Sequence, residues 1–161
     1  MTTYVSYGCL CRHGRAPVLK PAGSDQSSRV HSECVEYSLD FESELGTLIV
    51  TVSGTASLEE LLGYQTEYLA DPRWSPGMKV LTDLRGFDSS TVTSDQVRAL
   101  AASNNLRADL FGSGRTAVVV SEPATFGLLR MFQFHTDAAG FDQRVFYSLE
   151  EARRWLAETP S

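Results

Sequence analysis

Several features that would place a protein in a specialised class are scarce or missing in this sequence. Three cysteines in 161 residues are too few for a disulfide scaffold. No apolar run approaches the roughly 18 residues of a membrane helix, and residues 1–20 lack the apolar stretch of a secretory signal. Basic residues are the minority, 14 against 20 acidic ones, and the net charge of −6 argues against nucleic acid or an anionic membrane as a partner. We therefore expect a globular, cytoplasmic protein that is not integral to a membrane.

Sequence signatures of catalysis are also missing. There is no nucleophile elbow, no dinucleotide-binding fingerprint and no paired-histidine metal motif. The glycine-rich stretch 112–114 precedes a predicted strand, whereas a phosphate-binding loop follows a strand and opens a helix. His135 has no cysteine or second histidine near it in the sequence, so we interpret it as a structural or surface residue. The sequence predicts a protein that is not an enzyme and that uses no cofactor.

Charge and composition divide the chain near residue 34. Residues 1–34 carry a net charge of +2, which leaves −8 on the remainder. They show no sustained helical or alternating pattern. They contain five soft metal ligands, namely Cys9, Cys11, His13, His31 and Cys34. We predict an N-terminal extension over residues 1–33 and an α/β domain over residues 34–159.

Three interpretations of the extension are open. Its mixed polar, proline and glycine content favours a flexible or irregular segment. A zinc site is the second, although Cys-x-Cys-x-His followed by a 17-residue gap matches none of the established ligand spacings. The third is an ordered extra strand or a partner-binding arm, anchored by Tyr4, Val5 and Tyr7.

From residue 35 onward the hydrophobic pattern predicts strands. Residues 35–41 and 47–53 alternate apolar and polar side chains on either side of a turn at Gly46, which is typical of a β-hairpin. Three further strands are predicted at residues 78–84, which have an apolar centre, at 115–121, which contain the apolar run 117–120, and at 143–147. The sequence therefore predicts five strands.

Four helices alternate with these strands. Three of them open with the spacing of a capping box: Ser57 with Glu60, Thr93 with Gln96, and Ser148 with Glu151. The fourth, residues 123–139, begins with a proline in its first turn and ends at Gly140. The resulting order predicts an α/β fold, a five-stranded mixed sheet with an N-terminal antiparallel hairpin, a mostly parallel remainder and four helices.

Two polar positions in these helices are informative. In the helix after Ser57, the periodicity leaves Gln65 and Glu67, with the two glutamates of the first turn, largely facing solvent. In the helix after Thr93, Asn104 continues the apolar face. It is either a buried amide with partners or the point at which the helix turns outward.

Several segments together carry a family resemblance. They are the hairpin, residues 57–62, 71–85 and 126–132, and the closing residues 145–152. Over about residues 35–158 the chain resembles small bacterial proteins of the SpoIIAA-like, STAS-related superfamily. The resemblance implies a domain of four helices and five strands without catalytic residues. Relatives act as anti-sigma-factor antagonists, as regulatory domains of transporters, or as carriers of apolar ligands in a lipid-binding branch.

The tripeptide Asp88-Ser89-Ser90 is similar to the phosphorylated step that begins the second helix in the best-known members of this superfamily. Here it follows Leu84 after only three residues, and the helix signal begins later, at Thr93. Thr91 stands where those members have glycine. Ser89 and Ser90 are candidate phosphorylation sites, and we favour a loop and helix-capping role for them.

A candidate polar site lies at the carboxyl ends of the predicted parallel strands, where open α/β sheets bind ligands. Asp83 and Arg85 fall there and are suited to hold a polar ligand. A local ion pair between them is the alternative, which we favour.

The predicted helix 123–139 has apolar side chains on more than one face, including Phe126, Met131 and Phe134. A helix packed on one sheet does not need apolar side chains on several faces. The additional apolar side chains are therefore covered by loops, or they contact a partner, a second copy or an apolar ligand. We therefore carry two functional hypotheses. The first is a regulatory or protein-interaction module, which binds a protein partner or forms a homodimer. The second is a carrier or sensor of a small apolar, lipid-like ligand in a pocket next to this helix.

Overall fold

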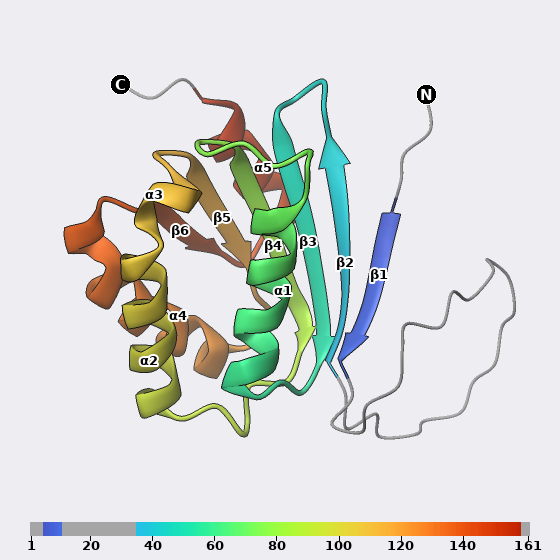
Figure 1. Ribbon diagram of the computed structural model, residues 1–161. Coiled ribbons are helices and arrows are strands. Elements are labelled where there is room, and N and C mark those ends of the chain that lie inside the picture. The colour runs from blue at the N-terminus through green and yellow to red at the C-terminus, as the bar shows by residue number, and fades with distance from the viewer. Residues whose placement is uncertain (1–4, 11–34, 159–161) are drawn as a thin grey trace, which may run out of the picture.

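The computed structural model describes residues 5–10 and 35–158, whose strands form one mixed sheet of six (Figure 1). The strands lie side by side in chain order. Strand β2 is antiparallel to both of its neighbours, β1 and β3, and strands β3 to β6 run parallel to one another. Their bounds are β1 Val5–Leu10, β2 Val35–Glu42, β3 Thr47–Gly54, β4 Lys79–Phe87, β5 Arg115–Val119 and β6 Asp142–Phe146.

The α/β fold class, the hairpin and the parallel strands predicted from the sequence are confirmed, and the sheet gains a sixth strand. Strand β1 pairs antiparallel with β2, with Val5 opposite Asp40 and Leu10 opposite Val35. It falls within residues 1–33, for which an ordered strand was one of three interpretations. The proposed boundary at residue 34 and most of the extension lie outside the described residues, so the division of the chain stays a prediction.

The four predicted helices are present: α1 (Leu58–Ala70), α2 (Ser94–Leu106), α4 (Pro123–Thr136) and α5 (Leu149–Ala157). Two short helical turns were not predicted, α3 (Ala108–Phe111) and the 3-10 turn η1 (Asp137–Ala139). The predicted helix 123–139 is therefore α-helical to Thr136 and tightens into η1 before Gly140, which has a left-handed φ of 80°.

Side-chain caps fix where these helices begin. In α1 the backbone N–H of Ser57 donates to Glu60 at 2.6 Å, and that of Glu60 donates to Ser57 Oγ at 3.3 Å. Thr93 and Gln96 make the same reciprocal pair at the start of α2, at 2.8 and 3.2 Å. At α5 only half of the predicted capping box forms, because Ser148 accepts from the N–H of Glu151 at 3.3 Å without a reciprocal bond.

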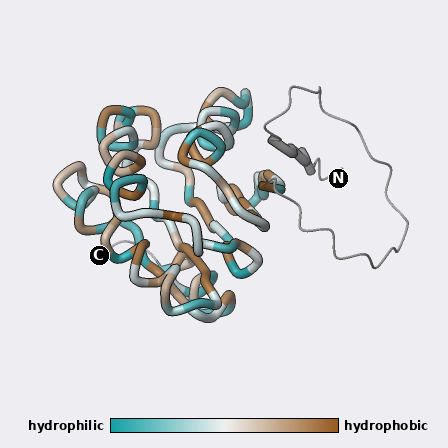
Figure 2. Tube along the Cα trace, turned by 90° about the horizontal axis from the view of Figure 1, so that it is seen from below, coloured by the Kyte–Doolittle hydropathy of each residue, from teal (hydrophilic) through white to brown (hydrophobic). Residues whose placement is uncertain are grey.

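The sheet separates two layers of helices. Parallel strands in sequential order with right-handed crossovers bring α1, α2 and α4 to the same face. Helix α5 follows the last strand and packs on the opposite face, where Trp155 and Leu156 contact Leu81, Ala117 and Val119. Apolar and polar residues alternate along the helices and strands (Figure 2), as elements that bury one side require.

Helix α2 is held by other helices and does not lie on the sheet. It packs against α4 and, less extensively, against α1. Its contact with α4 is a small apolar cluster of Val97, Ala101 and Phe132. Because α2 bridges the two helices that lie on the sheet, a space remains beneath it.

Candidate functional site

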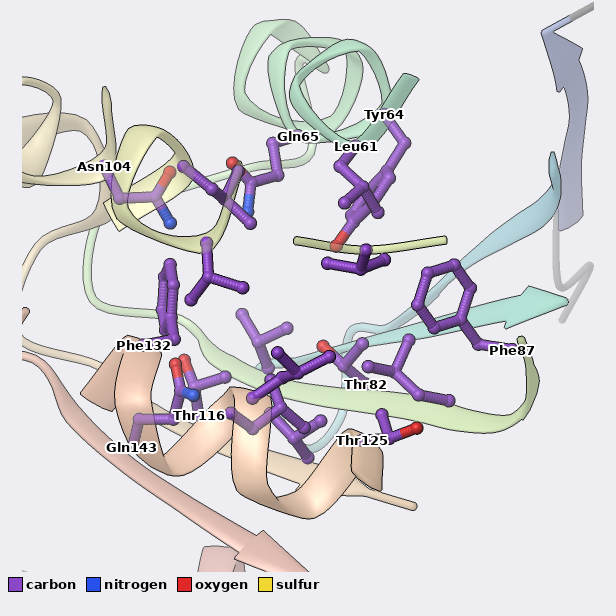
Figure 3. Close-up of a pocket in the computed structure, with 18 of the residues that line it drawn as sticks. Leu61, Tyr64, Gln65, Thr82, Phe87, Asn104, Thr116, Thr125, Phe132 and Gln143 are labelled. Carbon is purple, nitrogen blue, oxygen red and sulfur yellow. The ribbon is translucent and has the colours of Figure 1, made fainter. Parts of the chain in front are cut away.

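A cavity of about 120 Å³ lies beneath α2, bounded by α1, α4 and strands β4 and β5 (Figure 3). Most of its wall is apolar. Side chains of all five elements contribute to this wall, among them Leu61, Val80, Leu84, Val97, Val118 and Phe132. The fold thus places an apolar cavity next to helix α4, where the sequence predicted a pocket.

A smaller cavity of about 30 Å³ adjoins it toward the N-terminal ends of α1 and α2. Four residues line both cavities: Leu61, Val92, Val97 and Leu100. Leu61, Val92 and Leu100 are only partly buried. The gap between α1 and α2 is therefore an apolar route from the surface to the larger cavity.

Three side-chain amides gather at one end of the larger cavity, those of Gln65, Asn104 and Gln143 (Figure 3). Two of them share one donor. Nη2 of Arg107 donates to Oε1 of Gln65 at 2.9 Å and to Oδ1 of Asn104 at 3.1 Å. With both oxygens engaged, the NH₂ groups of Gln65 and Asn104 are the atoms turned toward the cavity, as Figure 3 shows.

Arg107 is well placed to fix these amides because it links α2 to α3. Its Nε donates to the carbonyl of Ser103 at 3.4 Å and its Nη1 to Thr66 at 3.3 Å. Its guanidinium carbon lies 5.6 Å from the ring centroid of Phe111. These contacts hold the arginine against both α1 and the end of α2.

Two buried tyrosines from α1 complete this part of the wall. Burial raises the pKa of Tyr64 to about 12, against a smaller lowering by a hydrogen bond with Gln65. Burial also raises the pKa of Tyr68 well above its usual value, with Tyr64 adding to the rise and Arg107 opposing it. Both hydroxyls therefore keep their protons at neutral pH.

The wall of the larger cavity is uncharged. Among the described residues, its lining contains no Asp, Glu, His, Cys, Lys or Arg side chain. The polar groups of the lining are side-chain amides and the hydroxyls of serine, threonine and tyrosine. The arrangement can enclose an apolar molecule and donate hydrogen bonds to it.

The two candidate phosphorylation sites are in different environments. Ser89 is buried at the cavity wall, and its Oγ lies 2.7 Å from Oγ1 of Thr125 at the start of α4. Ser90 is exposed, and its backbone N–H donates to Asp88 at 2.9 Å. Neither caps α2, because that position belongs to Thr93. Phosphorylation of either serine stays a prediction.

Asp83 and Arg85 lie away from the cavity and pair with each other. Nη2 and Nε of Arg85 donate to the two carboxylate oxygens of Asp83 at 2.7 and 3.0 Å. These hydrogen bonds hold the pKa of Asp83 below its usual value. Asp83 shares its side of β4 with Leu81, which packs toward α5. The pair has the geometry of the local ion pair, and a ligand-binding role for it stays untested.

The three apolar residues singled out in α4 have separate environments. Phe126 stacks on Tyr147 with ring centroids 4.9 Å apart. Met131 packs against the cluster that joins α4 to α2. Phe134 is 79% exposed. Other α4 residues, Thr125, Leu128, Leu129 and Phe132, line the cavity, so the excess apolar surface of this helix is divided among four surroundings.

Four of the five candidate metal ligands, Cys11, His13, His31 and Cys34, lie outside the described residues, and Cys9 falls in β1. The zinc interpretation is therefore untested.

Sequence reasoning identified one of the cavity amides and misplaced another. Asn104 is 5% exposed and bonded to Arg107, which is the buried-amide alternative. Gln65 was expected to face solvent, and that expectation is wrong, because it is 7% exposed and contacts Arg107. Glu67 is exposed, as expected, and it accepts a hydrogen bond from the hydroxyl of buried Tyr37. The sequence pattern around Gln143 and Arg107 did not indicate that either residue belongs to the site.

Comparison with known proteins places the fold. No family model and no curated protein matches the chain. Among solved structures, it is similar to an uncharacterised protein of the DUF3478 family from Shewanella loihica PV-4, described as having a SpoIIAA-like fold. The match has a TM-score of 0.51 and 16% identity, and it covers 83% of this chain and all of the other.

The chain has a SpoIIAA-like fold. The resemblance stated from the sequence is thereby confirmed at the level of fold. In the SpoIIAA-like fold of this chain, the cavity lies under the helix that follows the second parallel strand. None of the helices in residues 35–158 is long and apolar enough to cross a membrane.

Proposed function

We propose that this chain is a non-catalytic binding domain that holds a small, mainly apolar molecule in the cavity beneath α2, as a sensor or carrier. The cavity itself is the observation that supports this proposal. Protein interiors pack as densely as organic crystals, and few voids exceed the size of a water molecule. A space of about 120 Å³ with a mostly apolar wall is therefore a feature that a ligand would fill.

The volume sets the size of the ligand. A dry apolar cavity of about 150 Å³ accommodates benzene. The cavity of this chain is of the same order, so we expect a ligand of about six to ten non-hydrogen atoms. A long acyl chain would fit only if part of it left through the gap between α1 and α2.

A cavity-filling variant tests the proposal. Val97 is buried and lines both cavities, so Val97→Phe places a ring in the space that the ligand would use. Ala102→Phe adds an aromatic side chain to the exposed surface of the same helix. Ethylbenzene should raise the Tm of the natural protein and of Ala102→Phe, and leave that of Val97→Phe unchanged. A Tm of the natural protein that is raised neither by ethylbenzene nor by its oxygen-bearing analogues acetophenone and benzoate would contradict the proposal.

A regulatory or protein-interaction role is a second candidate, favoured by exposed apolar side chains. Phe134 is 79% exposed and Leu106 is 90% exposed. Nδ2 of Asn105 donates to the carbonyl of His135 at 2.9 Å. This bond brings together the chain segments that carry Leu106 and Phe134. Under this second proposal, the protein is cytoplasmic, and a second copy or another protein buries Phe134 and Leu106.

The change Phe134→Ser separates the two roles. It should reduce self-association or partner binding, measured by sedimentation, without changing the Tm, because Phe134 makes little buried contact. Two results together would count against the interaction role. The natural protein and the variant would both sediment as monomers, and native mass spectra of protein from its own host would show no partner.

A further inference from the structure

We infer that the cavity selects ligands that carry an sp² oxygen acceptor, a carbonyl or a carboxylate, at the end next to Asn104. This inference rests on the proposed binding function and specifies the chemical class of the ligand. It is carried by the amide groups at one end of the cavity and by the apolar character of the other.

The side-chain amide of Asn104 directs a hydrogen-bond donor into the cavity. Its residue is 5% exposed, its Oδ1 accepts from Arg107 at 3.1 Å, and Figure 3 shows its nitrogen directed into the cavity. Among the described residues, the hydrogen bond of the Asn104 side chain is the one that its Oδ1 accepts from Arg107, which leaves its Nδ2 available to a ligand. This donor gains a partner when an acceptor on the ligand reaches it, so a ligand with such an acceptor would be stabilised here.

The orientation of this amide follows from chemistry. An arginine side chain has only N–H donors, so the atom of Asn104 or Gln65 that faces Arg107 must be the oxygen. The NH₂ groups must then point the other way, and the positive charge behind them favours a ligand atom of negative partial or full charge. Arg107 therefore orients both amides so that their NH₂ groups can donate hydrogen bonds into the cavity.

A second donor lies at the same end. Nε2 of Gln143 is shielded from solvent and has no hydrogen-bond partner in the described part of the chain. The backbone carbonyl of Gln143 accepts a hydrogen bond from Gln133 of α4, which holds β6 against the helix at this point. Figure 3 places Asn104 and Gln143 on one side of the cavity and Phe87 on the other.

The remaining wall defines the rest of the ligand. Away from the amides, Phe87 provides an apolar surface, and Leu84 and Val118 are further apolar residues of the lining. A ligand with an apolar body and one terminal oxygen acceptor satisfies both ends. A purely hydrocarbon ligand of the same size would leave the donors unpaired, and sites built to hydrogen bond a ligand discriminate strongly against analogues that lack the group.

Three probes of nearly equal size test this inference: ethylbenzene, acetophenone and benzoate. They share a ring and differ in bearing no oxygen, a neutral carbonyl or a carboxylate. Calorimetric titration of the natural protein should give at least one oxygen-bearing probe a Kd about tenfold below that of ethylbenzene, the gain of one good hydrogen bond. The comparison of acetophenone with benzoate shows whether the selected acceptor is neutral or anionic.

The variant Asn104→Asp removes the donor while keeping the side-chain shape and an oxygen for Arg107. It should abolish the preference for acetophenone or benzoate and leave ethylbenzene affinity within about twofold. Asn105→Asp adds the same charge one residue later, at an exposed position outside the cavity lining, and should retain the preference.

The outcomes separate the inference from the function on which it rests. Equal affinity of the natural protein for all three probes overturns the inference and leaves the proposed binding function standing. An oxygen preference that survives in Asn104→Asp also overturns it. If none of the probes binds, the binding function fails, and the inference fails with it. Because the comparison of probes uses the natural protein, a variant that does not fold leaves the first test intact.

Discussion

Nη2 of Arg107 lies 3.1 Å from Oδ1 of Asn104 and donates a hydrogen bond to it. The same nitrogen donates to Gln65 of α1 at 2.9 Å, so one guanidinium connects the C-terminal end of α2 to α1 across the cavity. Helix α2 lacks an extensive contact with the sheet. This polar contact therefore holds the helix that covers the cavity at the end where the amides lie.

Replacement of Arg107 should destabilise the protein and loosen the cavity. Arg107→Met keeps an apolar stem beside Phe111 but leaves the oxygens of Gln65 and Asn104 without a donor. We expect a loss of about 1–3 kcal/mol in the free energy of unfolding, measured in urea. Arg98→Met, at an exposed position of α2, should change it by less than about 0.5 kcal/mol. Equal effects of the two changes would show that Arg107 has no special role.

The buried hydrogen bond between Ser89 and Thr125 should couple the loop after β4 to α4. Its oxygens are 2.7 Å apart and both residues are buried. Ser89→Ala and Thr125→Val should each reduce the free energy of unfolding by about 1–2 kcal/mol. The double variant should lose less than the sum of the two, by about 1 kcal/mol, in a double-mutant cycle. Strict additivity would mean that the two hydroxyls do not interact.

The raised pKa of Tyr64 predicts a loss of stability in alkali. Its pKa is about 12 in the folded protein and about 10 in the unfolded chain. The unfolded state therefore releases this proton first, and the stabilisation present below pH 10 is lost as the pH rises toward 12. Two pKa units correspond to about 3 kcal/mol.

Urea unfolding between pH 9 and pH 12 measures this effect. Tyr64→Phe should lose less stability over this range than the natural protein, by about 2 kcal/mol at pH 12, because phenylalanine does not titrate. Some decline should persist in the variant, since burial also raises the pKa of Tyr68. Parallel decline of the two proteins would show that Tyr64 titrates normally.

Local sequence patterns predicted most helices and strands. The features that they did not predict depend on contacts between residues far apart in the sequence. The caps at Ser57 and Thr93 are local contacts between residues three apart, so their spacing in the sequence was sufficient. Strand β1 was only one of three interpretations of its segment. Its partner β2 begins 25 residues after β1 ends, and the sequence pattern of β1 is too short to decide between them.

The sequence predicted that a pocket lies beside one helix, but not which elements enclose it. The prediction of a pocket beside residues 123–139 came from the excess of apolar residues on that helix. The space itself depends on how α2 rests on α1 and α4, which periodicity does not encode. Gln65 was misassigned because its burial depends on Arg107, 42 residues away.

Methyl NMR of the natural protein, titrated with ethylbenzene, tests the binding cavity most directly. Binding should shift the methyl signals of Leu84, Val97 and Val118, which line the cavity, with one saturating curve. The methyls of Leu81 and Leu156, on the opposite face of the sheet, should stay unshifted and serve as the internal control. Absent shifts in the cavity, or shifts confined to the surface around Leu106, would contradict the account.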